Sequence, residues 1–381
     1  MKTKVPPLDL QAEFREIRPE FTERARRIFA SGRYILGAEV NEFERNFERF
    51  IGTQYAVGVA SGSDALLLSL MAFGIKEGDE ILTTPFSFIA TATAIARLGA
   101  KPVFVDIDPD SFNLNAALIK RKITKKTRGI ILVHLYGNPC QMDGIMSVAK
   151  RYDLFVIEDC AQACGATFRG KQVGSFGDFG AFSFYPTKTI GAMGDAGAIT
   201  TNNKELYEKV KRLHLHGEEK RNNSSRSYLH AAIGINSRLD EIQAAVLNVK
   251  LKHLAKWNQA RRKAAERYDK LILRAGLAMI EIPKPNSAGK TVYHQYIIRA
   301  PKRDQLLAHL CSLGVSAGIY YPIPLHLQPC FRYLGYRRGH FPVAEQASRE
   351  VLSLPLYPQI SSREQNHVIS SLSKFFKKTN I

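Results

Sequence analysis

Residues 180–200 read GAFSFYPTKTIGAMGDAGAIT and lie at the centre of the predicted fold. The apolar and aromatic run at 181–185 predicts a buried strand, which Pro186 ends because proline has no N–H to donate. Lys188 follows in a loop, before a second predicted strand at 197–201. A lysine held at a strand end can be partly desolvated, which lowers its pKa and makes its amine nucleophilic. A surface lysine whose stem covers apolar neighbours is the alternative from this stretch alone.

The 381 residues carry a formal net charge of +19, with 45% hydrophobic residues. This length predicts two domains. The basic residues form short scattered clusters without a nucleic-acid-binding motif, so we expect a solvated basic surface, no nucleic-acid partner and no membrane insertion. The five cysteines are odd in number, and Cys160 and Cys164 lack the second pair that a zinc site requires. We therefore expect no metal, reduced thiols and a cytoplasmic protein, and the N-terminus shows no signal peptide.

Apolar runs without alternation are separated by helical patterns, and they occupy residues 81–84, 103–106, 129–135 and 154–158. This arrangement predicts an α/β fold whose parallel sheet is covered by helices on both faces. Residues 237–240, SRLD, predict a capping box that opens a long helix. The composition changes after 283–285, PKP, where a smaller α+β domain with a strand at 316–321 is predicted.

Two strand ends carry polar groups. Ser61, Gly62 and Ser63 follow a strand and open a helix, where free N–H groups, a hydroxyl and the helix dipole favour an anion. A helix cap without a ligand is the alternative. Asp159 ends another strand, and a carboxylate there needs a cation, either Lys188 or a protonated ring nitrogen. A lysine for a Schiff base and an acidic partner for the ring nitrogen are what pyridoxal phosphate (PLP) requires, so the residues predict a PLP site.

Eight blocks carry a resemblance to a known family, and they are YILG at 34–37, SGSDA at 61–65, TPFSFIATA at 84–92, PVFVDID at 102–108, EDCAQA at 158–163, SFYPTK at 183–188, NSRLDEIQAA at 236–245 and YYPIPLHLQ at 320–328. In this ordered set the chain resembles the DegT/DnrJ/StrS sugar-nucleotide aminotransferases, which are fold-type-I PLP enzymes. The resemblance implies a large PLP-binding domain, residues 1–250, with a mostly parallel seven-stranded sheet. Residues 251–381 would form a smaller α+β domain, on which the chain up to about residue 20 would pack.

The resemblance also implies how the cofactor is bound. Lys188 would form the Schiff base, and Asp159 would pair with the pyridine nitrogen. Phe88 would stack on the ring and Gln162 would reach its 3-hydroxyl region. The phosphate would be held by Gly62, Ser63 and Ser183.

Other implied residues concern the substrate and a second subunit. Asn236 would reach the phosphate of a neighbouring subunit, which implies a homodimer with shared sites. The substrate side would include Arg238, Tyr320 and His326. Ser63 stands where threonine is more usual, and it keeps the hydroxyl.

By family analogy, L-glutamate donates the amino group and PLP cycles through pyridoxamine phosphate. The acceptor is a nucleotide-linked deoxysugar in amino-sugar biosynthesis, for lipopolysaccharide or glycosides. The form SRLDEIQ, with His214, His216, Tyr228 and His230 before it, favours C3 of a dTDP-3-keto-6-deoxyhexose, although these side chains also suit an ordinary polar loop.

Four alternative functions stand beside this one. One is a C4 aminotransferase acting on a dTDP- or UDP-4-keto sugar. A second is a non-catalytic regulator that retains the fold. Dehydratases of the family replace the Schiff-base lysine, so Lys188 disfavours them. A PLP desulfurase would need a cysteine in a mobile loop, for which Cys330 is the candidate.

Overall fold

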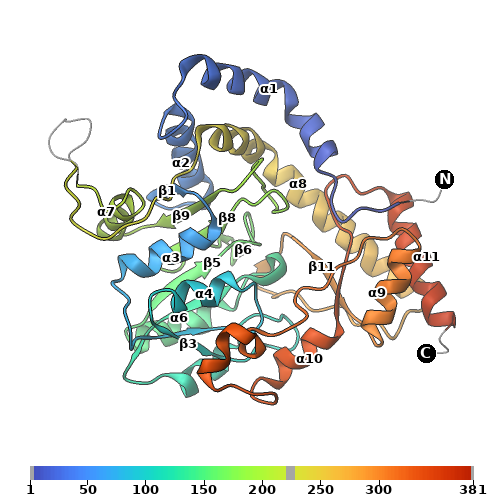
Figure 1. Ribbon diagram of the computed structural model, residues 1–381. Helices are drawn as coiled ribbons and strands as arrows, with labels where there is room; N and C mark the ends of the chain where they lie inside the picture. Colours follow the sequence, from blue (N-terminus) through green and yellow to red (C-terminus); the bar gives the residue numbers. More distant parts are fainter. Residues whose placement is uncertain (1–3, 220–227, 379–381) are drawn as a thin grey trace.

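The computed structural model describes residues 4–219 and 228–378, and its centre is a seven-stranded sheet in the order β1-β9-β8-β5-β4-β2-β3 (Figure 1). The strands are β1 (Tyr55–Val59), β2 (Glu80–Thr83), β3 (Lys101–Phe104), β4 (Thr127–Val133), β5 (Phe155–Asp159), β8 (Phe179–Ser183) and β9 (Gly197–Thr201). β9 is antiparallel to β1 and β8, whereas the other neighbouring strands pair in parallel. The predicted α/β fold with a mostly parallel seven-stranded sheet is confirmed.

Helices cover both faces of this sheet, which explains why its strands are apolar without alternation. The α-helices between residues 10 and 274 are α1 (Leu10–Ser31), α2 (Ala38–Ile51), α3 (Gly62–Ala72), α4 (Ala90–Ala96), α5 (Ala116–Ile119), α6 (Met142–Arg151), α7 (Lys204–Leu213) and α8 (Glu241–Arg274). Phe182 packs in one cluster with Phe43 and Phe47 of α2, whereas the adjacent Ala181 packs with Leu66 of α3. Successive residues of β8 therefore point to opposite, covered faces.

The start of α8 differs from the predicted capping box. Asp240 is the N-cap residue, and its side chain makes no capping hydrogen bond. Ser237 instead donates its hydroxyl to Asp64 at 2.7 Å. The Glu241 carboxylate turns away from its own helix and accepts the N–H groups of Gly37, Glu39 and Val40 at 2.7–3.0 Å. The prediction of a capping box was wrong because the Ser237 hydroxyl bonds to Asp64 and Asp240, the predicted acidic member, is itself the N-cap residue.

We expect Glu241→Gln to lower the free energy of unfolding by about 2–3 kcal/mol, because hydrogen bonds to a buried charge are lost and an amide N–H faces other donors. Urea unfolding followed by circular dichroism measures the change. Glu266→Gln, on an exposed part of the same helix, is the matched control and is expected to change stability by less than about 0.5 kcal/mol. Equal shifts in the two variants would contradict the assigned anchoring of the α1–α2 turn.

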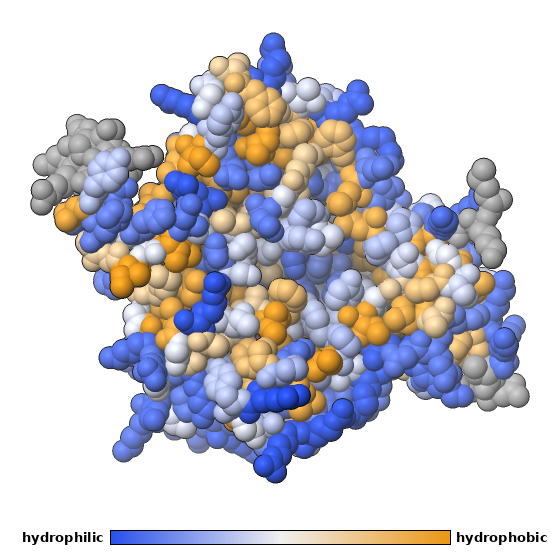
Figure 2. Space-filling view, in the orientation of Figure 1, coloured by the Kyte–Doolittle hydropathy of each residue, from blue (hydrophilic) through white to orange (hydrophobic). Residues whose placement is uncertain are grey.

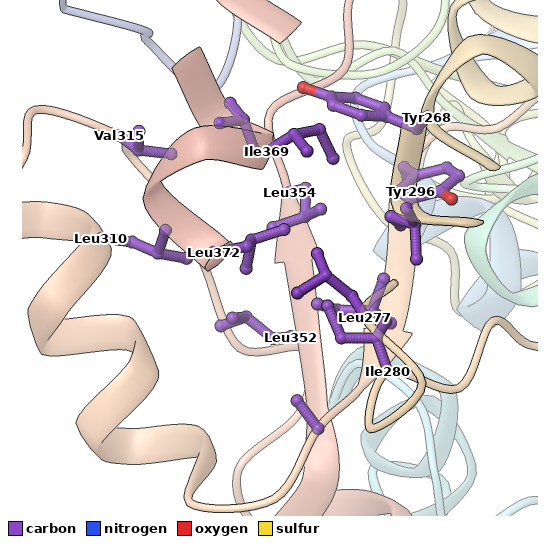
Figure 3. Packing of buried hydrophobic residues seen from close by; sticks show 14 of the residues in the cluster. Tyr268, Leu277, Ile280, Tyr296, Leu310, Val315, Leu352, Leu354, Ile369 and Leu372 are labelled. Atoms are coloured by element: carbon purple, nitrogen blue, oxygen red, sulfur yellow. The ribbon is translucent and has the colours of Figure 1, made fainter. Parts of the chain in front are cut away.

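The C-terminal part of the chain packs around a second core (Figure 3). Its elements are β11 (Tyr296–Arg299), α9 (Arg303–Ser312), α10 (Pro342–Glu350), β12 (Val351–Leu354) and α11 (Ser362–Lys378), with β11 and β12 antiparallel. Val5 bridges to Val315 and belongs to this core. The predicted strand at 316–321 is wrong, since only Gly318 forms a bridge there, to Ser353. A domain boundary at residue 250, as the sequence suggested, would fall inside α8.

Short elements complete the described chain. They are β6 (Thr167–Phe168), β7 (Lys171–Gln172) and β10 (Gly289–Lys290), which form a small sheet, and the 3₁₀ helices η1 (Lys120–Lys122), η2 (Leu135–Gly137), η3 (Leu325–Leu327) and η4 (Pro329–Leu334). The five cysteines are all unpaired. Within residues 4–219 and 228–378, no helix combines the length and the apolar composition that a membrane crossing needs.

Candidate active site

A cavity of about 840 Å³ lies beyond the carboxyl ends of β1, β4, β5 and β8, and residues of the C-terminal part of the chain close its other side. This is where ligands bind in open parallel sheets. Nine of the residues singled out from the sequence line it, and they are Ser61, Gly62, Ser63, Phe88, Asp159, Gln162, Ser183, Lys188 and Tyr320. Their convergence follows from strand direction, because parallel strands end at one edge of the sheet.

Lys188 and Asp159 form an opposite-charge pair in this cavity. Burial lowers the pKa of the Lys188 amine, and the negative charge of Asp159 offsets part of this shift. Burial raises the pKa of Asp159, against the hydrogen bonds from the Thr91 hydroxyl at 2.9 Å and the Ala161 N–H at 3.1 Å and against the charge of Lys188. The site thus holds a carboxylate in a fixed orientation, and burial makes the Lys188 amine easier to deprotonate to its nucleophilic form than an exposed lysine.

The lowered pKa of Lys188 has a measurable consequence for pH dependence. Only the neutral amine reacts with an acylating reagent, so protonation at low pH suppresses the reaction. We expect competitive labelling of the cofactor-free protein with acetic anhydride, resolved by mass spectrometry, to give a labelling curve for Lys188 with its midpoint below 10.5, the ordinary lysine value. A midpoint at or above 10.5 would contradict the burial argument.

The start of α3 forms an anion cradle. The Ser61 hydroxyl accepts the N–H of Asp64 at 3.1 Å and so caps the helix, as the alternative interpretation foresaw. The N–H groups of Gly62 and Ser63 in the first turn have no intrahelical acceptor. A Cβ at Gly62 would lie 2.5 Å from the Cβ of Ser183, so only glycine lets α3 pack directly on the end of β8. This contact brings the Ser183 hydroxyl to the helix N-terminus, where a phosphate is favoured.

Aromatic and amide groups form the opposite wall. Gln162 accepts the N–H of Tyr136 at 2.6 Å and donates to the Tyr321 hydroxyl at 3.0 Å, so its amide is fixed at both ends. Phe88 is 55% exposed, and its ring centre lies 6.2 Å from that of Tyr321. The Tyr136 hydroxyl donates to the carbonyl of Tyr320. These contacts join the large sheet to the segment 320–321 and leave an aromatic face open to the cavity.

Three residues assigned by resemblance do not line the cavity: Asn236, Arg238 and His326. His326 is buried, and its Nε2 lies 3.1 Å from the Glu345 carboxylate because η3 turns the ring toward α10. His326 therefore forms an internal pair in this structure, and its assignment to the substrate side stays a prediction. Asn236 is exposed and Arg238 is half-buried, both next to the N-terminus of α8.

The histidines before α8 also lie apart from the residues that line the cavity. His214 is buried at the end of α7, where Nδ1 lies 3.1 Å from the Val210 carbonyl and burial lowers its pKa to about 4. The Nδ1 of His230 lies 3.0 Å from the His216 carbonyl. These contacts serve the local fold. Residues 220–227 of the predicted polar loop lie outside the described residues.

Sequence reasoning missed several residues that line the cavity, namely Ser87, Thr91, Asp195, Arg261, His294, Gln295 and Tyr321. Thr91 could have been found, since it stands in the block at 84–92 one helical turn after Phe88. Arg261 carried no signal, because it stands in the basic middle of a long helix where solvent-exposed arginines are common.

His134, Glu158 and Cys160 form a buried group whose donor atoms lie within 4.8 Å of one another. The N–H of Cys140 donates to Nδ1 of His134, so the proton is on Nε2, which donates to Glu158 at 3.0 Å. Glu158 also accepts three backbone N–H groups from residues 174–177. His134 and Glu158 thus use their hydrogen bonds inside the protein, and Glu158 fixes the loop that follows β7.

The residues of the cavity fit PLP. A lysine amine of lowered pKa, a carboxylate oriented by two donors, a helix N-terminus with hydroxyls and an open aromatic face lie in one enclosure. The amine would react with the aldehyde of PLP, and the carboxylate would pair with its ring nitrogen. The helix N-terminus would bind the phosphate, and the aromatic face would stack on the ring.

The model of the DegT/DnrJ/EryC1/StrS aminotransferase family matches residues 15–373. The chain belongs to this family. It is a PLP-dependent sugar-nucleotide aminotransferase, as the resemblance implied.

Three curated relatives show the range of names within the family. A "pleiotropic regulatory protein" of Geobacillus stearothermophilus is 45% identical over 98% of this chain and 99% of its own length. The dTDP-3-amino-3,4,6-trideoxy-alpha-D-glucose transaminase of Streptomyces venezuelae is 39% identical over 99% and 97% of the two chains. A UDP-N-acetyl-3-dehydro-alpha-D-glucosamine 3-aminotransferase of Acidithiobacillus ferrooxidans is 42% identical over 95% of both.

A solved structure agrees with the fold of the aminotransferase. S. venezuelae DesV, crystallised in complex with a ketimine intermediate, superimposes with a TM-score of 0.93 and 40% identity over 98% of each chain.

Proposed function

We propose that this aminotransferase transfers the amino group of L-glutamate to C3 of a dTDP-3-keto-6-deoxyhexose. The observation that carries the proposal is the Lys188–Asp159 pair beside an anion cradle in one cavity. The volume of about 840 Å³ suits a cofactor together with the sugar of a nucleotide substrate. The relatives named for 3-amino or 3-dehydro sugars support the C3 position.

PLP, when bound, supplies an electron sink for a carbanion at the carbon that exchanges its nitrogen. The chain supplies the proton transfers and the orientation. The Lys188 amine accepts the proton from the α-carbon of the donor and, in the second half-reaction, delivers a proton to the sugar carbon that receives nitrogen. Asp159 holds positive charge at the ring nitrogen, and Thr91 and the Ala161 N–H fix the direction of its carboxylate. The net positive charge favours arrival of a nucleotide diphosphate.

A panel of keto-sugar nucleotides tests the acceptor. Purified protein is incubated with PLP, ¹⁵N-labelled L-glutamate and either dTDP-3-keto, dTDP-4-keto or UDP-keto sugars, and products are examined by mass spectrometry and NMR. We expect label at C3 of the dTDP-3-keto sugar. Label at C4 would favour the C4 alternative, and preference for a UDP sugar would favour the substrate named for the A. ferrooxidans relative. Incorporation into none of them, with DNA retention that depends on salt, would favour the regulator alternative.

We further propose a homodimer in which Asn236 and Arg238 reach the partner's cavity. Both residues lie outside their own cavity, near exposed apolar side chains such as Tyr34 (52% exposed) and Ile233 (93% exposed). Hydrophobic groups also gather on the face over α1 and α2 in Figure 2. A mixture of Lys188→Ala and Asn236→Ala chains, refolded together, is expected to regain activity that neither has alone, because one intact site forms per mixed dimer. No recovery in a proven mixed dimer would contradict shared sites.

We also propose a cytoplasmic location in the biosynthesis of lipopolysaccharide or glycoside amino sugars. Five unpaired cysteines, three of them buried, support a reducing compartment. Cell fractionation with an antibody to this chain tests the location, and recovery from the periplasm would contradict it.

A further inference from the structure

A second polar region lies in the same cavity, on the side formed by the C-terminal part of the chain. Arg261 comes from the middle of α8, and His294 and Gln295 come from the segment just before β11. The proposed function uses none of them. The phosphate cradle is built from different elements, at the ends of β1 and β8.

These three side chains carry buried polar atoms that find no partner within the described residues. They are Nε of Arg261, Nδ1 of His294 and Oε1 of Gln295. Arg261 is only 2% exposed, and its Nη1 donates to the carbonyls of Leu356 at 2.9 Å and Tyr293 at 3.4 Å. A buried guanidinium satisfied only by carbonyl oxygens is costly, because its charge has no counter-ion.

Other charges around Arg261 do not supply that counter-ion. The Glu13 carboxylate interacts electrostatically with Arg261, but it forms its ion pair with Lys250. Burial lowers the pKa of Arg261 to about 10, although Glu13 opposes the shift. Burial also lowers the pKa of His294, and the positive charges of Lys188 and Arg261 lower it further. His294 therefore lies within electrostatic reach of both the reactive lysine and the buried arginine, and stays neutral.

We infer that Arg261, with His294 and Gln295, forms the subsite that binds a carboxylate of the amino donor. The inference rests on the proposed function and names where that function's first substrate is held. An arginine presents a planar set of N–H donors that matches a carboxylate, and an anion there supplies the missing counter-ion. The group is enclosed, which suits a small carboxylate, whereas the diphosphate of the sugar nucleotide is larger and remains the competing anion.

Binding of a donor analogue that cannot complete transamination tests the subsite. The full-length, PLP-loaded protein is titrated calorimetrically with 2-methyl-L-glutamate, which has no α-hydrogen to lose, and separately with thymidine diphosphate. We expect Arg261→Gln to raise the Kd of the glutamate analogue at least tenfold and to change that of thymidine diphosphate less than twofold, because a charge-assisted hydrogen bond is lost. Arg261→Lys keeps the charge without the planar donors and is expected to lie between Arg261→Gln and wild type.

Lys263→Gln is the matched control, since it removes one positive charge from the exposed face of the same helix. It is expected to leave both Kd values unchanged. His294→Gln leaves the Arg261 contacts to Leu356 and Tyr293 in place and serves as a second variant, with an expected threefold or greater rise in Kd for the analogue. Thermal unfolding shows whether Arg261→Gln folds. If it does not, the Kd values of His294→Gln and Arg261→Lys for the glutamate analogue test the subsite instead.

Unchanged affinity for the glutamate analogue in the folded variants would overturn the inference, as would a loss that falls on thymidine diphosphate. Failure of the proposed function is distinguishable, because wild-type protein would then fail to exchange nitrogen with L-glutamate at all. A wild type that does exchange, with variants that bind the analogue equally well, rejects the subsite alone.

Discussion

Replacing Lys188 with alanine is expected to reduce amino transfer by at least about 10³-fold, because both the nucleophilic amine and the proton carrier are lost. The formation of 2-oxoglutarate from L-glutamate, measured with a coupled dehydrogenase in the presence of the keto sugar, gives the rate. Lys188 is half-buried, and burial lowers the pKa of its amine, which makes the amine easier to deprotonate.

Lys188→Arg separates two roles of the lysine. Arginine retains the positive charge beside Asp159 but does not become neutral, so we expect the same loss as for alanine with a smaller change in stability. Lys204→Ala, at the exposed start of α7, is the control and is expected to retain full activity. Activity within tenfold of wild type in Lys188→Arg would show that charge, and not a neutral amine, is what the site needs.

Asp159→Asn has the second large expected effect, a loss of about 10²–10³-fold in the rate of amino transfer. An amide of the same shape can accept from Thr91 but cannot hold a positive charge at the ring nitrogen, so carbanion formation at the donor loses its stabilisation. The same coupled assay measures the rate, and absorbance of the bound cofactor checks that occupancy is retained.

The control for this variant is Asp153→Asn, just before β5 and so at the end of that strand opposite Asp159. Asn tolerates the positive φ of 52° at that position, so the change is expected to be silent. A rate for Asp159→Asn within a few-fold of Asp153→Asn, at full cofactor occupancy, would show that the carboxylate has no electrostatic role.

Much of the sheet and of the cofactor side of the cavity could be predicted, because both depend on patterns local in the chain. Apolar runs followed by Ser61 or Asp159 identify strands and their carboxyl ends, and strand direction then brings those ends together. Lys188 could be placed in the same way, in the loop after a strand, although β8 ends at Ser183 and so before Pro186, where the sequence predicted its end. β9 runs antiparallel, a property that its sequence does not encode by itself.

Other features depend on contacts between distant segments. SRLD predicted a capping box, but Ser237 bonds to Asp64, 173 residues away, and Glu241 bonds to the turn before α2. His326 stands in the block at 320–328, whose sequence does not show that η3 turns its ring to Glu345. The sequence pattern around Arg261 predicts an exposed side chain. In the structure it is buried, because the segment 293–295 and Leu356 pack against it and accept its hydrogen bonds.

The central claim is that this chain takes nitrogen from L-glutamate through Lys188. The most direct measurement is the visible absorption spectrum of PLP-reconstituted protein, before and after L-glutamate is added, for wild type and Lys188→Ala. We predict a yellow absorbance band that L-glutamate removes in the wild type, with no such response in Lys188→Ala. A wild-type band that L-glutamate leaves unchanged, or the same response in both proteins, would contradict the account.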